Sequence, residues 1–205
     1  MMHSFLKILD TLFFPCICFV CKKNNETICT SCLQSLPRPL DTPENFILSR
    51  FSYKDKRVKK IIHAIKFFHR KDLIQPLASE MTLPLNEKDT SHYIVVPIPM
   101  PYTRKLFRGY NQSELLARAL AQHSGLELDS SALVRKRSPS RQVTTLSRKE
   151  RLTNQKNSFR ATVHGEGKHY LLVDDVTTTG ATLREARQAL VDAGAASVHA
   201  VTIAH

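Results

Sequence analysis

The stretch 170–183 constrains the fold of this chain more than any other part of the sequence. It begins with a continuous apolar run, 170–173, which is typical of a central parallel strand covered on both faces. Two adjacent carboxylates, Asp174 and Asp175, follow where this strand is predicted to end. A turn of small residues comes next, and apolar side chains then recur at helical spacing as far as Val191. The pattern predicts a strand, an acidic pair, a tight turn and a helix, as in α/β folds.

The chemistry of this unit indicates a phosphorylated ligand that also carries hydroxyl groups. Backbone N–H groups and threonine hydroxyls of such a turn converge on an anion, and the N-terminus of the following helix favours negative charge. The two carboxylates do not bind phosphate, but they can accept hydrogen bonds from the vicinal hydroxyls of a ribose. The unit therefore predicts a ribose 5-phosphate site at the carboxyl end of a strand. The alternative is an ordinary strand–helix turn with a capping threonine.

Residues 170–182 resemble the phosphoribosyl pyrophosphate (PRPP) motif of the type I phosphoribosyltransferases. The resemblance implies that the two aspartates hold the ribose 2′- and 3′-hydroxyls and that the turn holds the 5-phosphate. It also implies Mg²⁺ bound together with PRPP, because the metal neutralises the diphosphate. The predicted PRPP-binding residues are Asp174, Asp175, Thr177, Thr178, Thr179, Gly180, Ala181 and Thr182.

Two Cys-x-x-Cys pairs, Cys18 with Cys21 and Cys29 with Cys32, lie seven residues apart. This spacing is typical of a tetrahedral zinc site, and four cysteine ligands leave no open position, so the predicted zinc is structural. A pair of disulfides is an alternative that fits secretion, and no secretory signal is recognisable. A redox site is a second alternative, but it would use a single pair. Cys16 is either a bystander or a replacement for Cys18 as ligand.

The chain is basic, with 30 Lys+Arg against 18 Asp+Glu and a formal net charge of +12. The basic residues concentrate in 50–71 and 135–160. Such an excess favours nucleic acid, phosphorylated small molecules or an anionic membrane surface as partners. An apolar helical face before residue 15 either packs on the protein itself or makes a peripheral membrane contact. That face comprises Phe5, Leu9, Leu12 and Phe13.

A second strand–loop–helix unit is predicted between residues 93 and 120, and its loop is basic. By the resemblance to phosphoribosyltransferases, Arg104 and Lys105 in this loop are predicted to counter the charge of pyrophosphate. The basic segment 135–160 is predicted to form a hairpin or lid over the site. Its side chains predicted to contact pyrophosphate or a nucleic acid strand are Arg137, Arg141, Gln142, Arg148 and Arg151.

The order of these segments along the chain resembles the ComF (ComFC/GntX) family of competence proteins, from about residue 14 to residue 205. The four-cysteine module, the Val-Pro-Ile-Pro run from Val96 and the Arg-Gly-Tyr-Asn-Gln block ending at Gln112 carry this resemblance. Tyr110 stands where that family usually has phenylalanine. The resemblance implies a zinc-finger module at 1–42 and a type I phosphoribosyltransferase fold at 43–205. We therefore expect an α/β domain with a central parallel sheet flanked by helices.

The resemblance also implies a role in natural transformation, in which the protein handles incoming single-stranded DNA beside a competence helicase and a recombination-loading protein. The expected location is the cytoplasm, or the inner face of the membrane if the N-terminal helix makes contact there. The alternative is an active phosphoribosyltransferase that transfers ribose 5-phosphate from PRPP to an acceptor. The sequence identifies neither the acceptor nor a catalytic base. Aromatic residues among the basic ones give limited support for base stacking: Phe51, Tyr53, Phe67 and Phe68. Alternatively, Phe67 and Phe68 are core residues.

Overall fold

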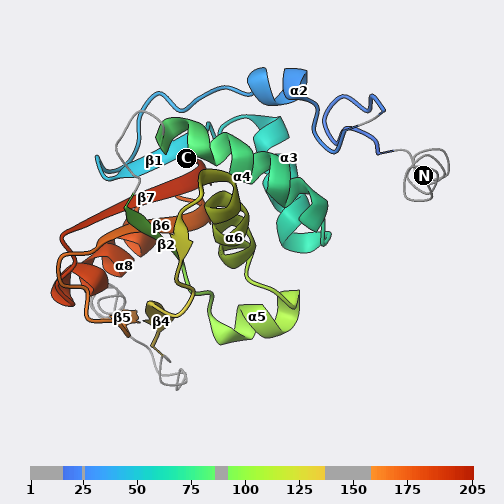
Figure 1. Ribbon diagram of the computed structural model, residues 1–205. Coiled ribbons are helices and arrows are strands. Elements are labelled where there is room, and N and C mark those ends of the chain that lie inside the picture. The colour runs from blue at the N-terminus through green and yellow to red at the C-terminus, as the bar shows by residue number, and fades with distance from the viewer. Residues whose placement is uncertain (1–15, 25, 86–91, 137–157) are drawn as a thin grey trace, which may run out of the picture.

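The computed structural model describes residues 16–24, 26–85, 92–136 and 158–205 of the chain. In this part of the chain the main sheet has five strands, all parallel, in the order β1-β7-β6-β2-β3 (Figure 1). The predicted parallel sheet is thereby confirmed. The strand bounds are β1 Ile47–Phe51, β2 Tyr93–Pro97, β3 Glu127–Leu128, β6 His169–Val176 and β7 Ser197–Ala204.

Helices cover both faces of this sheet, and alternate side chains of β6 divide between them. Leu171 and Val173 are buried in the cluster that includes α4 and α6, whereas Tyr170 and Leu172 are buried in the cluster that includes α8. This alternation follows from the period of two along a strand. The helix bounds are α2 Thr30–Gln34, α3 Lys56–Phe67, α4 Ile74–Thr82, α5 Tyr102–Arg108, α6 Gln112–Ser124 and α8 Ala181–Asp192, with short 3₁₀ turns η1 Lys71–Leu73 and η2 Leu83–Leu85.

Local sequence explains where two of these helices begin. The Asp55 carboxylate accepts hydrogen bonds from the N–H groups of Arg57 and Val58 and so caps α3. The Asn111 side chain accepts from the N–H group of Ser113 and caps α6 in the same way. In α3 the apolar positions recur at helical spacing and are buried, as the sequence predicts; these are Val58, Ile61, Ile62 and Ile65.

Three details differ from the sequence-based expectations. Strand β6 does not stop before the acidic pair but runs on to Val176, so that both aspartates lie within its last residues. The segment after β2, expected as a loop, contains the short helix α5, none of whose residues is buried. Phe51, expected as a stacking residue, is fully buried in the core.

A small antiparallel sheet lies beside α8 and consists of β4 (Leu133–Arg135) and β5 (Phe159–Ala161). The two strands bracket residues 137–157. Most of the predicted lid 135–160 lies in that interval, outside the described residues, including Arg137, Arg141, Gln142, Arg148 and Arg151. Their roles therefore stay predictions, as does the amphipathic face expected before residue 15.

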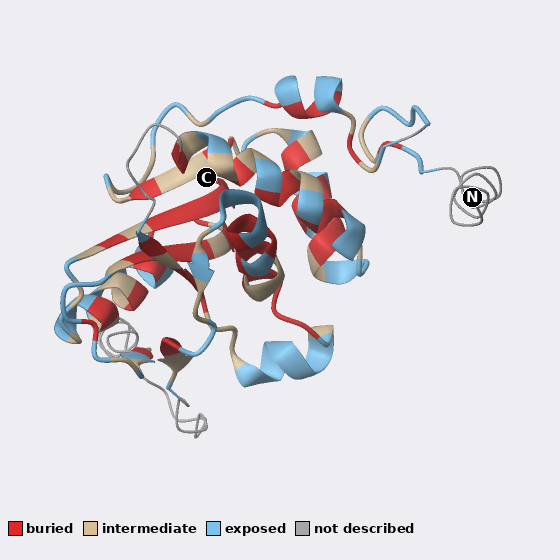
Figure 2. Cartoon of the chain, in the orientation of Figure 1, coloured by how far each residue is buried: buried red, intermediate tan, exposed pale blue. Residues whose placement is uncertain are grey.

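The four-cysteine module shares a hydrophobic cluster with α3 and α4. Cys18, Ile28 and Leu36 are buried in this cluster (Figure 2). The guanidinium of Arg57 on α3 also donates hydrogen bonds of 3.0 Å to the hydroxyl and carbonyl oxygens of Ser35. The predicted boundary between 42 and 43 stays a prediction. Within the described ranges no helix has the length and apolar character needed to cross a membrane.

The strand order creates a crevice at the carboxyl ends of the two neighbouring strands β2 and β6. The chain leaves β2 towards β3 on one side, and leaves β6 towards β7 on the other, although β2 and β6 are neighbours. In open α/β sheets ligands bind at such a switch point, outside the carboxyl ends of the strands. The acidic pair at the end of β6 lies at this crevice.

Candidate functional site

A polar cleft of about 300 Å³ occupies this switch point. Asp174 and Asp175 from β6 and Thr182 from the first turn of α8 line it. Four basic side chains line it as well. The other polar residues that line the cleft are Lys66, Arg104, Arg108, Asn111, Gln112, Ser113 and Arg135.

The two carboxylates have different partners. Asp174 accepts hydrogen bonds from the hydroxyl of Ser113 at 2.7 Å and from the N–H group of Asp175 at 2.9 Å. Asp175 forms an ion pair with Lys66, with 2.9 Å between Nζ and Oδ2. Burial and the adjacent charge of Asp175 raise the pKa of Asp174 to about 7. The ionised pair is therefore held at a cost in stability, and hydrogen bonds from ligand hydroxyls would offset that cost.

The Arg-Gly-Tyr-Asn-Gln block holds together the elements beside the acidic pair. The hydroxyl of Tyr110 donates to the carbonyl oxygen of Ile65 in α3. The Asn111 amide donates to the carbonyl oxygen of Ile98 after β2 at 3.0 Å while it caps α6. These bonds join α3, β2 and α6 beside the cleft. They also place Ser113 against the acidic pair.

The side-chain amide nitrogen of Gln112, in this block, has no hydrogen-bond partner among the described residues. Gln112 is 1% exposed and lines the cleft. Its side-chain oxygen accepts from Arg108 at 3.3 Å. Its amide nitrogen, in contrast, is buried and has no acceptor among the described residues. Because a buried donor without a partner is costly, this nitrogen is a candidate ligand contact.

The small-residue turn begins α8 without a side-chain cap, so the first N–H groups of that helix need an acceptor from outside it. The predicted phosphate-binding residues do not all line the cleft. Thr182 does, whereas Thr177 and Thr178 line a neighbouring hollow of about 240 Å³. Thr179, Gly180 and Ala181 line neither of these two cavities. Assignment of the whole turn to the 5-phosphate stays a prediction.

A side chain at Gly180 is expected to strain the backbone and to crowd Ile47. Its φ is +72°, and a Cβ atom there would lie 3.2 Å from Cδ1 of Ile47. We expect Gly180→Ala to reduce the free energy of unfolding by about 1–2 kcal/mol and to weaken PRPP binding. Gly125→Ala is the matched control, because its φ is +70° and its Cβ would meet nothing within 4 Å. Denaturant unfolding and PRPP titration separate the two effects; equal PRPP affinity in both variants would remove the turn from the site.

The cleft cations form a second group. The guanidinium of Arg135 lies 4.9 Å from the centre of the Phe159 ring, and burial together with the nearby Arg104 lowers its pKa. Arg135 nevertheless stays charged, because a guanidinium does not deprotonate in proteins. Arg104 and Arg135 both line the cleft, and their charges favour an anion there. Lys105, on the exposed helix α5, is not among the residues that line the cleft. The assignment of Arg104 and Lys105 to pyrophosphate stays a prediction.

Six polar residues of the cleft were given no site role from the sequence. Four of them belong to the Arg-Gly-Tyr-Asn-Gln block or follow it directly, so their positions could have been inferred: Arg108, Asn111, Gln112 and Ser113. Lys66 and Arg135 come from α3 and β4, and no local pattern brings them to the acidic pair. Only the folded arrangement does so.

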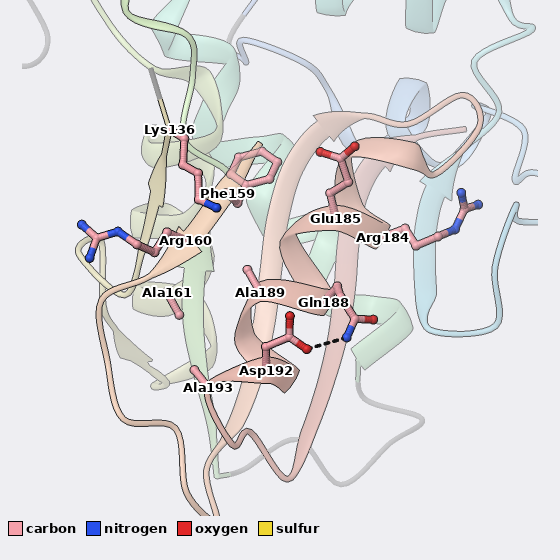
Figure 3. Close-up of a pocket in the computed structure, with 10 residues that line it drawn as sticks. All are labelled: Lys136, Phe159, Arg160, Ala161, Arg184, Glu185, Gln188, Ala189, Asp192 and Ala193. Atoms are coloured by element: carbon pink, nitrogen blue, oxygen red, sulfur yellow. Dashed lines mark hydrogen bonds between the residues drawn. The ribbon is translucent and has the colours of Figure 1, made fainter. Parts of the chain in front are cut away.

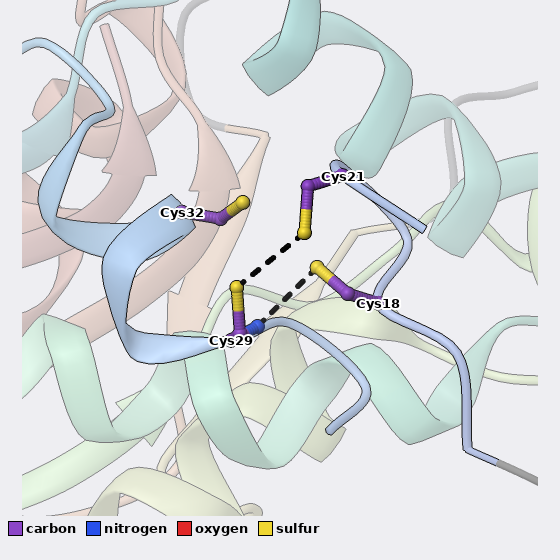
Figure 4. Close-up of side chains that lie close together, drawn as sticks. All are labelled: Cys18, Cys21, Cys29 and Cys32. Atoms are coloured by element: carbon purple, nitrogen blue, oxygen red, sulfur yellow. Dashed lines mark hydrogen bonds between the residues drawn. The ribbon is translucent and has the colours of Figure 1, made fainter. Parts of the chain in front are cut away.

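The four cysteines converge at a second site (Figure 4). The sulfur atoms of Cys18, Cys21, Cys29 and Cys32 all lie within 4.8 Å of one another. The Cys21 and Cys29 sulfurs are 3.7 Å apart, close to the edge of about 3.8 Å of a tetrahedron with zinc–sulfur bonds of about 2.3 Å. Cys16 lies outside this cluster and contacts the Thr27 hydroxyl at 3.3 Å.

The protonation of the cluster also fits a metal. Burial raises the pKa of the Cys18 thiol, but N–H groups of neighbouring residues outweigh burial and lower that pKa to about 6. Burial and the neighbouring sulfurs raise the pKa of Cys32 to about 12. Four thiolates can therefore coexist only around a cation. The cluster can hold a metal such as zinc, and its chemistry is structural because all four ligands come from the protein.

A larger cavity, of about 580 Å³, lies between α8 and the small sheet (Figure 3). The Arg184 guanidinium points away from it and pairs with Glu44. Gln188 and Asp192 hydrogen-bond to each other at 2.7 Å. Neither the acidic pair nor the cysteine cluster contributes to this cavity, so it offers no converging set of reactive groups.

Comparison with known proteins gives three kinds of match. The family model "Phosphoribosyl transferase domain" matches residues 111–205. The "DNA utilization protein YhgH" of Escherichia coli (strain K12) is 33% identical over 175 residues, covering 83% of this chain and 74% of the relative. The "Competence protein ComFC" of Bacillus subtilis (strain 168) is 30% identical over 160 residues, covering 76% of this chain and 62% of the relative.

Among solved structures, the glutamine PRPP amidotransferase from B. subtilis, in complex with ADP and GMP, matches 69% of this chain with a TM-score of 0.46 and 21% identity. The match spans 30% of that enzyme chain.

Proposed function

Because the chain belongs to the ComF family, we propose that it binds PRPP and handles incoming single-stranded DNA in natural transformation. It has the type I phosphoribosyltransferase fold and a four-cysteine cluster in its N-terminal region. One observation carries the PRPP part of this proposal: the acidic pair of β6 lies in a polar cleft at the sheet's switch point, and basic side chains line the same cleft. The names of the relatives, a DNA utilization protein and a competence protein, support the DNA part.

The cleft residues divide naturally over the parts of PRPP. Asp174 and Asp175 would accept hydrogen bonds from the ribose hydroxyls, and the start of α8 would hold the 5-phosphate. Arg104 and Arg135 would lie near the diphosphate, with the amide of Gln112 as a further donor. Mg²⁺ bound with PRPP would neutralise part of the diphosphate charge.

The charge of the whole chain supports the DNA part of the proposal. Lysine and arginine contacts with phosphates bind strands without regard to sequence, and the net charge is +12. The metal would hold the N-terminal module in place rather than take part in chemistry. By this proposal the protein works in the cytoplasm or at the inner face of the membrane, with a helicase and a recombination-loading protein as partners.

A second candidate function is transfer of ribose 5-phosphate from PRPP to an acceptor. The cleft cations Arg104 and Arg135 favour it, because a departing pyrophosphate needs positive charge. In this reaction the bond between the ribose C1 and the pyrophosphate oxygen breaks, and an acceptor forms the new bond to C1. Release of pyrophosphate only when candidate acceptors are added would establish this activity.

The test is a titration of the full-length protein with PRPP and Mg²⁺, with and without a single-stranded oligonucleotide, at two salt concentrations. We expect one PRPP per chain, and an affinity for DNA that falls steeply as salt rises. Ribose 5-phosphate and pyrophosphate serve as competitors that separate the two ends of the site. Absence of PRPP binding would refute the ligand assignment, and absence of DNA binding would refute the proposed role in DNA handling.

A further inference from the structure

A further cavity, of about 490 Å³, lies on α3 between that helix and the four-cysteine module. Aromatic rings and lysines share its lining, and no acidic residue is among the described residues that line it. We call this the α3 surface. The residues that define it are Phe19, Tyr53, Phe67 and Phe68, with Lys59, Lys60 and Lys66.

The rings at the end of α3 are open to solvent. Phe67 is 48% exposed and Phe68 is 67% exposed. The ring of His63 lies between them, at 4.6 Å from the first and 5.4 Å from the second, measured between ring centres. Apolar rings that remain exposed together and are rimmed by charge mark an interaction site rather than part of the core.

Cations accompany the rings of this surface. Lys59 lies 5.7 Å from the centre of the Tyr53 ring, and Arg108 lies 5.0 Å from that of Phe67. Lys22 and Arg70 lie 5.3 and 5.2 Å from the centre of the Phe19 ring. Cations therefore lie over the rings of Phe19, Tyr53 and Phe67.

This combination of aromatic rings and cations matches the chemistry of one type of partner. A single strand presents unstacked base faces and a phosphate on every nucleotide, so rings and lysines can bind both. A duplex hides the base faces within its stack. An anionic membrane would offer negative charge but no flat rings for stacking.

We propose that the α3 surface binds single-stranded DNA, with bases stacked on Phe67 and Phe68 and phosphates held by the lysines. The proposal rests on the DNA part of the proposed function and names where the strand lies. Lys66 lines both this cavity and the polar cleft, and it pairs with Asp175. The bound strand therefore passes the mouth of the cleft.

The first test removes the two exposed rings together, as Phe67→Ala/Phe68→Ala in the full-length protein. Fluorescence anisotropy with a labelled oligothymidine should show binding weaker by about tenfold or more, with the salt dependence unchanged. The matched control is Phe107→Ala, which removes an 84% exposed ring on α5, outside the α3 surface. It should bind DNA as the unmodified chain does.

The second test reverses charge. Lys59→Glu/Lys60→Glu should weaken binding and flatten its salt dependence, because fewer phosphates are contacted. Lys168→Glu is the matched control, since Lys168 is exposed at the amino ends of the strands. Thermal unfolding and metal content, measured for every variant, show that each is folded.

The outcomes distinguish this surface from the wider proposal. If the unmodified chain binds DNA and the ring variant binds equally well, the α3 surface is wrong and the proposed function stands. If the unmodified chain binds no DNA, the proposed DNA role fails as well. Matched RNA of equal length, duplex DNA and anionic vesicles are run in parallel. Loss of binding to vesicles alone in the ring variant would assign the surface to a membrane and overturn the proposal.

Discussion

Replacing Asp174 by asparagine is expected to weaken PRPP binding by about tenfold to a hundredfold while making the protein more stable. Asparagine can keep the two hydrogen bonds that Asp174 accepts, from Ser113 and from the N–H group of Asp175. It removes, however, the charge that would accept from a ribose hydroxyl, and a hydrogen bond to a charged group is worth about 1.5–3 kcal/mol. It also removes the repulsion between two neighbouring buried carboxylates.

The stability gain has a defined pH dependence. Because the pKa of Asp174 is raised to about 7 in the folded protein, ionisation of this group destabilises the native state as pH rises from about 4 to about 7. The Asp174→Asn variant lacks that loss. We expect it to gain about 1 kcal/mol at pH 8, equivalent to about 2–4 °C in Tm, and nothing near pH 4.

The pH profile of PRPP binding provides the control. In the unmodified chain PRPP affinity should rise between pH 6 and pH 8, as Asp174 ionises. The asparagine variant should lack this step, while any pH dependence that comes from the phosphates of PRPP is common to both proteins. Calorimetric titration at several pH values measures it. Equal profiles, or a less stable variant at pH 8, would contradict the account of the acidic pair.

Loss of the metal is expected to have the largest effect on stability. Structural zinc sites bind with apparent free energies of about 10–16 kcal/mol, and here the ligand Cys18 is fully buried in the cluster shared with α3. We expect Cys18→Ser to lose most of its metal and to lower Tm by about 10 °C or more. Metal analysis and scanning calorimetry measure both quantities.

Cys16→Ser is the matched control for this change. Cys16 is exposed and lies outside the four-sulfur cluster, so this variant should keep one metal ion per chain and the Tm of the unmodified protein. The reverse result, with metal lost on replacing Cys16 and kept on replacing Cys18, would move the ligand set by two residues. A chelator should reproduce the effect of Cys18→Ser in the unmodified chain.

The parts of the fold that could be predicted from sequence are those with local signals. The apolar run of β6, the helical spacing of α3 and the paired cysteines each report on a structure formed by neighbours in the chain. The family resemblance added the overall architecture, which the family comparison confirms. The end of β6 was misplaced because a carboxylate can lie within a strand when its neighbours satisfy it, as Ser113 does for Asp174.

Residues brought in from distant segments could not be predicted. Lys66 comes from α3, and only the folded arrangement brings its ammonium to Asp175. Arg135 is the first residue of the predicted lid 135–160 and was not distinguished from the rest of it. The exposure of Phe67 and Phe68 was likewise hidden, since two adjacent phenylalanines at the end of an amphipathic helix usually indicate core.

The shared hydrophobic cluster of the four-cysteine module and α3 bears on how the two parts can be separated. Ile28, Leu33 and Leu36 are buried in that cluster with α3 and α4. A fragment that starts after residue 42 would leave an uncovered apolar face on α3, which is a surface prone to self-association. We therefore expect the module to keep the sheet domain from self-association, and exchanging it between relatives would require matching both sides of that contact.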